Sequence, residues 1–140
     1  MNPDERLIGM PLGFRRLRNR WAAERYIQLV DSVLQAGPVE DRAKGAIWWV
    51  EAQPGQAFVR LRNKSRDDHY LHVEHGSLQC SPIEPAWQSA QWYLEAVKGT
   101  PYYRIRNRWQ EECYIHCEHD SLEAGNIEDG WRSAHWAIEY

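Results

Sequence analysis

Two short clusters of side chains in this sequence have the chemistry to bind a sugar. Each contains a histidine, a glutamate two positions later and a tryptophan in the turn that follows. Imidazole and carboxylate groups can hydrogen-bond to hydroxyls, and an indole ring can cover an apolar C–H face. We therefore predict a ligand-binding site at each cluster. The clusters are His72, Glu74 and Trp87, and His116, Glu118 and Trp131.

Alternating apolar residues predict that each histidine and glutamate lies on a β-strand. In the segment YLHVE, Leu71 and Val73 have the spacing of core residues. Side chains two positions apart share one face of a strand, so His72 and Glu74 should point outward together. The adjacent His75 should then point to the other face. The alternative is a solvated strand face that binds nothing.

The tryptophans leave two arrangements open. Trp87 and Trp131 lie in polar turns with proline or glycine, where a ring is either exposed for stacking or folded back over a hairpin. Trp21 and Trp109 follow an RxRN motif in another loop. They could be additional stacking surfaces or lids over the mouth of a barrel, and they are secondary candidates for the ligand site.

Both clusters belong to a sequence that repeats three times with a period of 44 residues and no gap. The copies span 14–51, 58–95 and 102–139, after an N-terminal extension over 1–13. Such a period is typical of a supersecondary unit that needs its neighbours to bury its apolar face. Four strands are predicted in the second copy, over 58–63, 70–74, 78–83 and 90–95. The sequence thus predicts twelve strands in a single all-β domain over residues 1–140.

Positions identical in all three copies indicate the shared scaffold. Trp48, Trp92 and Trp136 alternate in phase with other apolar residues, which predicts three core rings. Glu51 is expected to pair across strands with an outward arginine of the Arg16 or Arg18 type. The first-copy members of the identical set are Arg16, Arg18, Asn19, Tyr26, Leu34, Glu40, Ala46, Trp48 and Glu51.

Positions shared by the second and third copies, and changed in the first, indicate function. The histidine, glutamate and tryptophan of the clusters are replaced in the first copy, together with His75 and Ser89. Concerted loss predicts two equivalent sites and one that has decayed. The replacing residues are Gln28, Val30, Asp31, Ala43 and Gly45.

The repeats resemble the β-trefoil superfamily, and within it the ricin-B-type lectins and arabinose-binding trefoil modules. A Tyr-Leu or Tyr-Ile pair opens the second strand, as in Tyr70-Leu71, and Ser-Ala-x-Trp opens the fourth, as in Ser89-Ala90-Gln91-Trp92. The resemblance implies a six-stranded barrel capped by three hairpins. It also implies a sugar contact just after the first core leucine of the second strand, where this chain has Gln28, His72 and His116. The ricin-type Gln-x-Trp motif and cysteine pairs are missing.

Composition argues against several classes of function. A net charge of -3 gives no basic field for nucleic acid, and no apolar run is long enough for membrane insertion. The first residues do not resemble a secretory signal, so a cytoplasmic location is expected. No nucleophile motif, phosphate loop or converging metal ligands are recognisable. We therefore expect neither an enzyme nor a cofactor or metal.

Two functions fit these observations. The first is a lectin-like module whose partner is a glycan or glycoconjugate, with sites in the second and third copies. The second is a protein-interaction module, such as a scaffold or toxin-associated subunit, that presents a surface rich in tryptophan and arginine. Loss of matched positions in one copy favours the glycan.

Overall fold

The chain forms twelve β-strands and, in its described part, three single-turn 3-10 helices. The computed structural model describes residues 10–40, 42–118, 121–128 and 130–140. We call β1–β4, β5–β8 and β9–β12 the first, second and third units. The strands are β1 Gly13–Asn19, β2 Tyr26–Val30, β3 Val33–Gly37, β4 Trp48–Ala52, β5 Val59–Asn63, β6 Tyr70–Glu74, β7 Ser77–Ser81, β8 Trp92–Ala96, β9 Tyr103–Asn107, β10 Tyr114–Glu118, β11 Ser121–Gly125 and β12 Trp136–Glu139.

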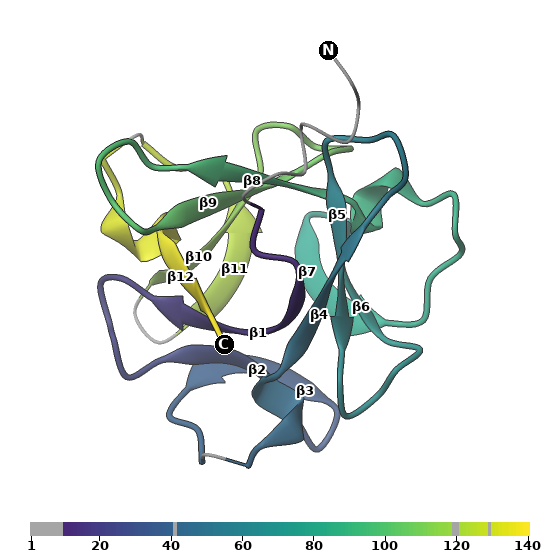
Figure 1. Cartoon of the computed structure of the whole chain (residues 1–140), viewed down its shortest axis with the longest axis horizontal. Coiled ribbons are helices and arrows are strands. Elements are labelled where there is room, and N and C mark those ends of the chain that lie inside the picture. The colour runs from purple at the N-terminus through teal and green to yellow at the C-terminus, as the bar shows by residue number, and fades with distance from the viewer. Residues whose placement is uncertain (1–9, 41, 119–120, 129) are drawn as a thin grey trace.

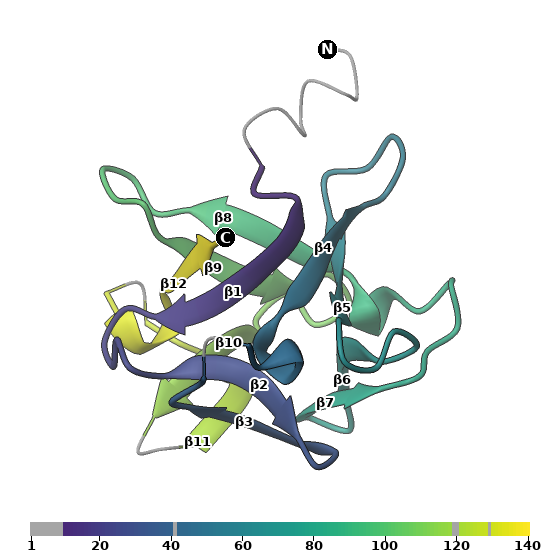
Figure 2. The ribbon, with the colours of Figure 1, turned by 60° about the horizontal axis from the view of Figure 1, so that its bottom comes forward.

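Six strands close into a barrel. Antiparallel pairing runs from β1 to β4, β5, β8, β9 and β12, and β12 returns to β1. The remaining strands form the hairpins β2–β3, β6–β7 and β10–β11. The hairpins are spaced around the barrel in Figure 1, and Figure 2 shows them gathered at one of its ends. The all-β architecture expected from the sequence is confirmed.

Three tryptophans fill the core where the units meet. Trp48, Trp92 and Trp136 are completely buried. Each indole N–H donates to the carbonyl oxygen of a second-strand residue, at 2.8 or 2.9 Å. A buried indole adds a large apolar area to the core, and its hydrogen bond offsets the cost of removing the N–H group from water. The prediction of three core rings is confirmed.

The strand bounds correct the sequence prediction at two places. The first and second strands of the second unit lie where expected, but β7 spans Ser77–Ser81 and β8 begins only at Trp92. Residues Gln88–Ala90 form the 3-10 helix η3 instead of the start of a strand. The helices η2 (Lys44–Ala46) and η4 (Arg132–Ala134) occupy the same place in the other units. Residues of η3 and η4 each form part of the wall of a surface groove.

Ion pairs on the barrel wall join adjacent strands. Glu51 accepts from Arg62 at 3.3 Å, as the cross-strand prediction required for an arginine of the Arg18 type. Glu95 pairs with Arg106 at 2.9 Å, and Arg18 pairs with Glu139 at 3.1 Å. These groups are partly exposed, so each pair contributes at most about 1 kcal/mol. They belong to the scaffold.

Candidate functional site

Two surface grooves lie where neighbouring units meet. The first groove has a volume of about 520 Å³ and the second a volume of about 300 Å³. Val73, Glu74, His75, Trp87, Gln88, Ser89 and Trp109 line the first groove. Trp21, Glu118, Trp131, Arg132 and Ser133 line the second groove.

Each groove draws its walls from two units. In the first groove, Glu74 and Trp87 come from the second unit, whereas Trp109 follows β9 of the third. In the second groove, Glu118 and Trp131 come from the third unit, whereas Trp21 follows β1 of the first. Trp21 is 62% exposed and Trp109 is 56% exposed. Two indoles and a carboxylate therefore line each groove.

A buried asparagine joins the two walls of the first groove. Asn107, at the end of β9, donates from Nδ2 to the Ser89 carbonyl oxygen at 2.9 Å. Its Oδ1 accepts from the backbone N–H groups of Trp109 and Gln110, at 3.0 and 2.9 Å. The side chain thereby connects the loop that carries Trp109 to the turn that follows Trp87.

Asn19 does the same in the second groove. Its Nδ2 donates to the Ser133 carbonyl oxygen at 2.9 Å, and its Oδ1 accepts from the backbone N–H groups of Trp21 and Ala22. Asn19 and Asn107 are completely buried. Sequence identity among the copies marked both residues, but their role at the grooves was not predicted.

His72 and His116 are buried and not exposed on the strand face, which corrects the prediction that they are open to a ligand. His72 is 1% exposed and His116 is 5% exposed. The ring of Trp87 meets His72 edge to face at 5.8 Å between centroids, and Trp131 meets His116 in the same way at 6.1 Å. The outer face of the hairpin is thus covered by the turn that carries the tryptophan. Each indole packs against a histidine and also lines its groove.

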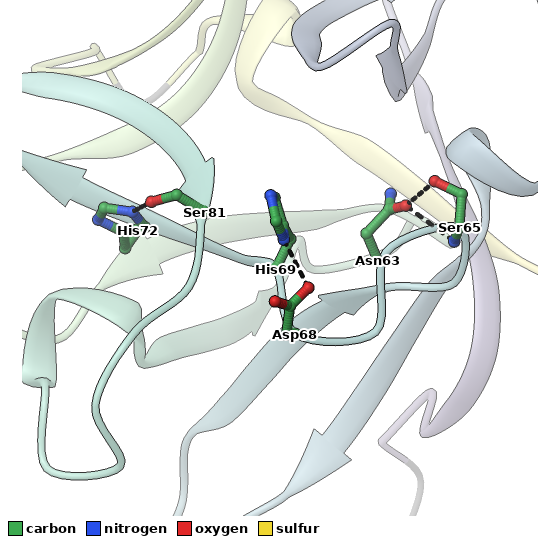
Figure 3. Close-up of polar contacts among 6 residues, drawn as sticks. All are labelled: Asn63, Ser65, Asp68, His69, His72 and Ser81. Atoms are coloured by element: carbon green, nitrogen blue, oxygen red, sulfur yellow. Dashed lines mark hydrogen bonds and ion pairs between the residues drawn. The ribbon is translucent and has the colours of Figure 1, made fainter.

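A hydroxyl fixes the buried ring of His72. Its Nε2 lies 2.6 Å from Ser81 Oγ on β7, as Figure 3 shows. Burial lowers the pKa of His72 below its ordinary value of 6.5, and the nearby Glu74 opposes that effect only in part. His72 is therefore a neutral support behind Trp87.

His75 also departs from the prediction, because it lines the same groove as Glu74. Strand β6 ends at Glu74, and His75 has a φ of 50° in the left-handed region. Strand alternation no longer applies beyond that point. The carboxylate and the imidazole are thus neighbours at one edge of the first groove. His119, the counterpart of His75, lies outside the described residues.

The seam between the first and second units lacks every one of these groups. Val30 and Ala43 replace the glutamate and the turn tryptophan, and Ser65 stands where the loop tryptophan would be. The asparagine contact is kept: Asn63 donates to the Gly45 carbonyl oxygen at 2.9 Å and accepts from Ser65, as Figure 3 shows in part. The asparagine framework of a groove therefore persists where the glutamate and the two tryptophans are absent.

The positions of Trp21 and Trp109 explain why the sequence did not predict that they line the same grooves as the hairpin residues. The hairpin residues are present in the second and third copies, whereas the loop tryptophans are present in the first and third. This one-copy offset is what a site shared between adjacent copies produces. Within the described residues, no group of three or more His, Cys, Asp or Glu could hold a metal ion. The described helices are also too short to cross a bilayer.

No protein-family model and no curated protein matches the chain, whereas solved structures do. The GlcNAcα1-4Gal releasing endo-β-galactosidase from Clostridium perfringens is 26% identical over 91% of this chain, with a TM-score of 0.80. This chain spans 32% of that enzyme.

SeviL bound to an asialo-GM1 saccharide is 19% identical, with a TM-score of 0.74 over 91% of this chain and 96% of SeviL. The designed threefold-symmetric protein ThreeFoil is 14% identical, with a TM-score of 0.76 over 91% and 99% of the two chains. The chain has the β-trefoil fold. In this β-trefoil, the grooves lie beside the hairpins, and each uses a loop from the next unit.

Proposed function

We propose that this β-trefoil is a non-catalytic, lectin-like module with a carbohydrate site in each groove. The supporting observation is the composition of the three seams between 44-residue repeats. Two tryptophans and a glutamate converge at two seams, and all three are replaced at the third. The buried asparagine that joins the walls is kept at all three seams, so the scaffold alone does not explain this concerted difference.

The lining groups suit a sugar ring. Trp87 and Trp109 come from separate walls of the first groove and can cover apolar C–H faces. Glu74 and His75 can exchange hydrogen bonds with hydroxyls at its edge. Weak sites of this kind gain avidity when two of them engage one multivalent surface. The likeness to SeviL, a structure with a bound saccharide, agrees with this function.

His72 and His116 have a supporting role in this proposal. Both are buried beneath a tryptophan, so they orient an indole and do not touch the sugar. The ligand contacts are assigned to Glu74, Trp87 and Trp109, and to Trp21, Glu118 and Trp131. The non-catalytic role and a cytoplasmic location remain predictions from the sequence.

A glycan array tests the proposal. The wild-type chain should give defined signals, and the Trp87→Ala/Trp131→Ala variant should lose them. Trp49→Ala is the matched control, because Trp49 packs on Phe14 at the barrel wall and lines neither groove. Absence of any wild-type signal refutes the carbohydrate function. Equal loss in both variants assigns the effect to folding.

Exposed apolar residues favour protein binding as the second candidate. Val30 and Val33 flank the tip of the β2–β3 hairpin and are 38% and 59% exposed. They lie on the unit that lacks the glutamate and the turn tryptophan. A wild-type chain that is silent on the array, but crosslinks to a protein through a photoreactive residue at Val33, would support this function.

A further inference from the structure

The two grooves share one framework but differ in charge. The turn residue after the tryptophan is Gln88 in the first groove and Arg132 in the second. Both turns have the same form, since the preceding tryptophans have φ near −70° and no side-chain cap. Gln88 and Arg132 therefore occupy equivalent places, and the second groove gains a guanidinium.

The guanidinium of Arg132 is available to a ligand. Arg132 is exposed, and no hydrogen bond or ion pair of its side chain is found among the described residues. In particular, no ion pair joins it to Glu118, which lines the same groove. An exposed cation beside two indoles is a suitable partner for a carboxylate or a sulfate, because a guanidinium can donate two parallel N–H bonds to such groups.

A second glutamine is also exchanged for a basic residue close to this groove. Gln91 of the second unit corresponds to His135, which is 4% exposed and has its Nδ1 atom 3.1 Å from Arg20 Nη1. Arg20 precedes Trp21 in the loop that forms the other wall. Burial lowers the pKa of His135, and the positive charges of Arg104, Arg20 and Arg132 lower it further. Arg108 occupies the place of Arg20 beside the first groove, where it donates to Gln91, so Arg132 is the cation by which the two grooves differ.

The first groove offers no such cation. None of its lining residues is a lysine or an arginine, and its Glu74 carboxylate faces the ligand space beside the neutral amide of Gln88. A negatively charged substituent in the first groove would meet a carboxylate without a compensating guanidinium. Like charges at close range disfavour binding.

We propose that the second groove selects sugars that carry an anionic group, whereas the first groove selects uncharged sugars. The proposal rests on the carbohydrate function and names the ligand class of each site. The anionic substituent is a carboxylate, as in sialic or uronic acids, or a sulfate ester, and Arg132 is the residue that determines the specificity. Trp21 and Trp131 cover the sugar ring, and Glu118 accepts hydrogen bonds from its hydroxyls.

Variants with a single groove provide the test. Trp131→Ala leaves the first groove and Trp87→Ala leaves the second, and thermal melts verify that both variants are folded. Each is titrated with one oligosaccharide in three forms: uncharged, sialylated and sulfated. The parent oligosaccharide is a neutral array ligand of the wild type. The second groove should bind at least one anionic form about tenfold more tightly than the neutral form, a typical effect of one charge-assisted hydrogen bond.

Exchanging the turn residues should exchange this preference. Arg132→Gln in the Trp87→Ala background should abolish the preference for the anion, and Gln88→Arg in the Trp131→Ala background should create it. The sialylated and sulfated arms identify which anion is preferred. High salt should weaken only the anion-dependent part of the binding.

The outcomes separate the two levels of the argument. If the wild type binds no glycan on the array, the carbohydrate function itself fails. If the wild type binds but neither single-groove variant binds any form, the grooves are not independent sites and the charge inference is overturned. If both bind with the same charge preference, the function stands and the charge inference is overturned. A preference that survives Arg132→Gln also overturns it, because the selectivity would then come from another residue.

Discussion

Replacing Asn107 by alanine should loosen the first groove without removing any residue that faces the ligand. The side chain makes three hydrogen bonds, to the Ser89 carbonyl and to the amides of Trp109 and Gln110. Asn63 also makes three hydrogen bonds, at the seam that lacks the groove tryptophans: it donates to the Gly45 carbonyl and accepts from the amide and the hydroxyl of Ser65. Asn63→Ala is therefore a matched control for the cost to folding.

The expected magnitudes follow from these contacts. Three buried hydrogen bonds of about 1 kcal/mol each predict that either variant loses about 3 kcal/mol of unfolding free energy. Only Asn107→Ala should also weaken sugar binding, because only it releases the loop of Trp109. An aromatic contact is worth about 0.5–1.5 kcal/mol beyond its burial, which corresponds to a two- to tenfold loss of affinity.

Urea denaturation and calorimetric titration measure the two effects separately. The titration is made in the Trp131→Ala background, where only the first groove can bind. Comparable stability losses with weaker binding in Asn107→Ala alone would support the positioning role. If Asn63→Ala weakened binding as much as Asn107→Ala, the effect would be a general consequence of lower stability. If neither variant changed affinity, the hydrogen bonds would not set the position of the indole.

Three further predictions concern pH, thiols and the seam between the first and second units. Burial lowers the pKa of His72 and His135 below 6.5, so these imidazoles bind protons more readily in the unfolded chain than in the folded one. The free energy of unfolding should therefore be fully retained above about pH 6.5 and should decrease as the pH falls below that value. His72→Gln/His135→Gln should flatten that fall in urea titrations. Burial raises the pKa of Cys80 to about 12, so iodoacetamide at pH 8 should label it only after denaturation, as mass spectrometry would show. Grafting the missing side chains should create a third site, raising calorimetric stoichiometry from two to three. The graft combines Val30→Glu, Ala43→Trp and Ser65→Trp.

The graft must leave Gly45 unchanged. Gly45 occupies the place of Ser89, but a Cβ atom there would lie 2.1 Å from the Leu29 carbonyl oxygen. Ala43, by contrast, has φ −69° and ψ 101°, close to φ −68° and ψ 108° of Trp87. Its backbone therefore already directs a side chain as the tryptophan requires. A stoichiometry that stays at two in a folded graft would show that the three residues are insufficient for a site.

The sequence was sufficient to predict the scaffold, because alternation and repetition are both consequences of packing. The spacing of Trp48, Trp92 and Trp136 predicted core rings, and all three are buried. Alternation was not sufficient for His72, since it distinguishes the two faces of a strand but not what covers each face. A turn that is distant in sequence brings Trp87 over the imidazole. For His75, the positive φ that ends the alternation depends on the turn geometry.

Comparison of the copies predicted two sites, and the structure has a groove at each place, but the comparison did not indicate how a groove is assembled. Aligning the copies compares equivalent residues, whereas a groove brings together residues from different copies. Glu74 of the second unit lines a groove with Trp109 of the third unit. Glu118 of the third unit lines the other groove with Trp21 of the first unit. The signal was present as the one-copy offset between the two sets of tryptophans. It becomes informative only once strand pairing shows which units are neighbours.

Assembly across seams makes each site dependent on the closed barrel. The second groove combines Trp21, near the start of the described chain, with Trp131, near its end. Strand β1 brings the two together by pairing with β12, where Leu17 faces Ile138 and Asn19 faces Trp136. The third unit alone carries a loop tryptophan, Trp109, that lines the first groove and a turn tryptophan, Trp131, that lines the second. In the proposed function, ligand binding at the second groove would therefore report closure of the barrel, and it should stabilise the β1–β12 pairing more than the internal seams.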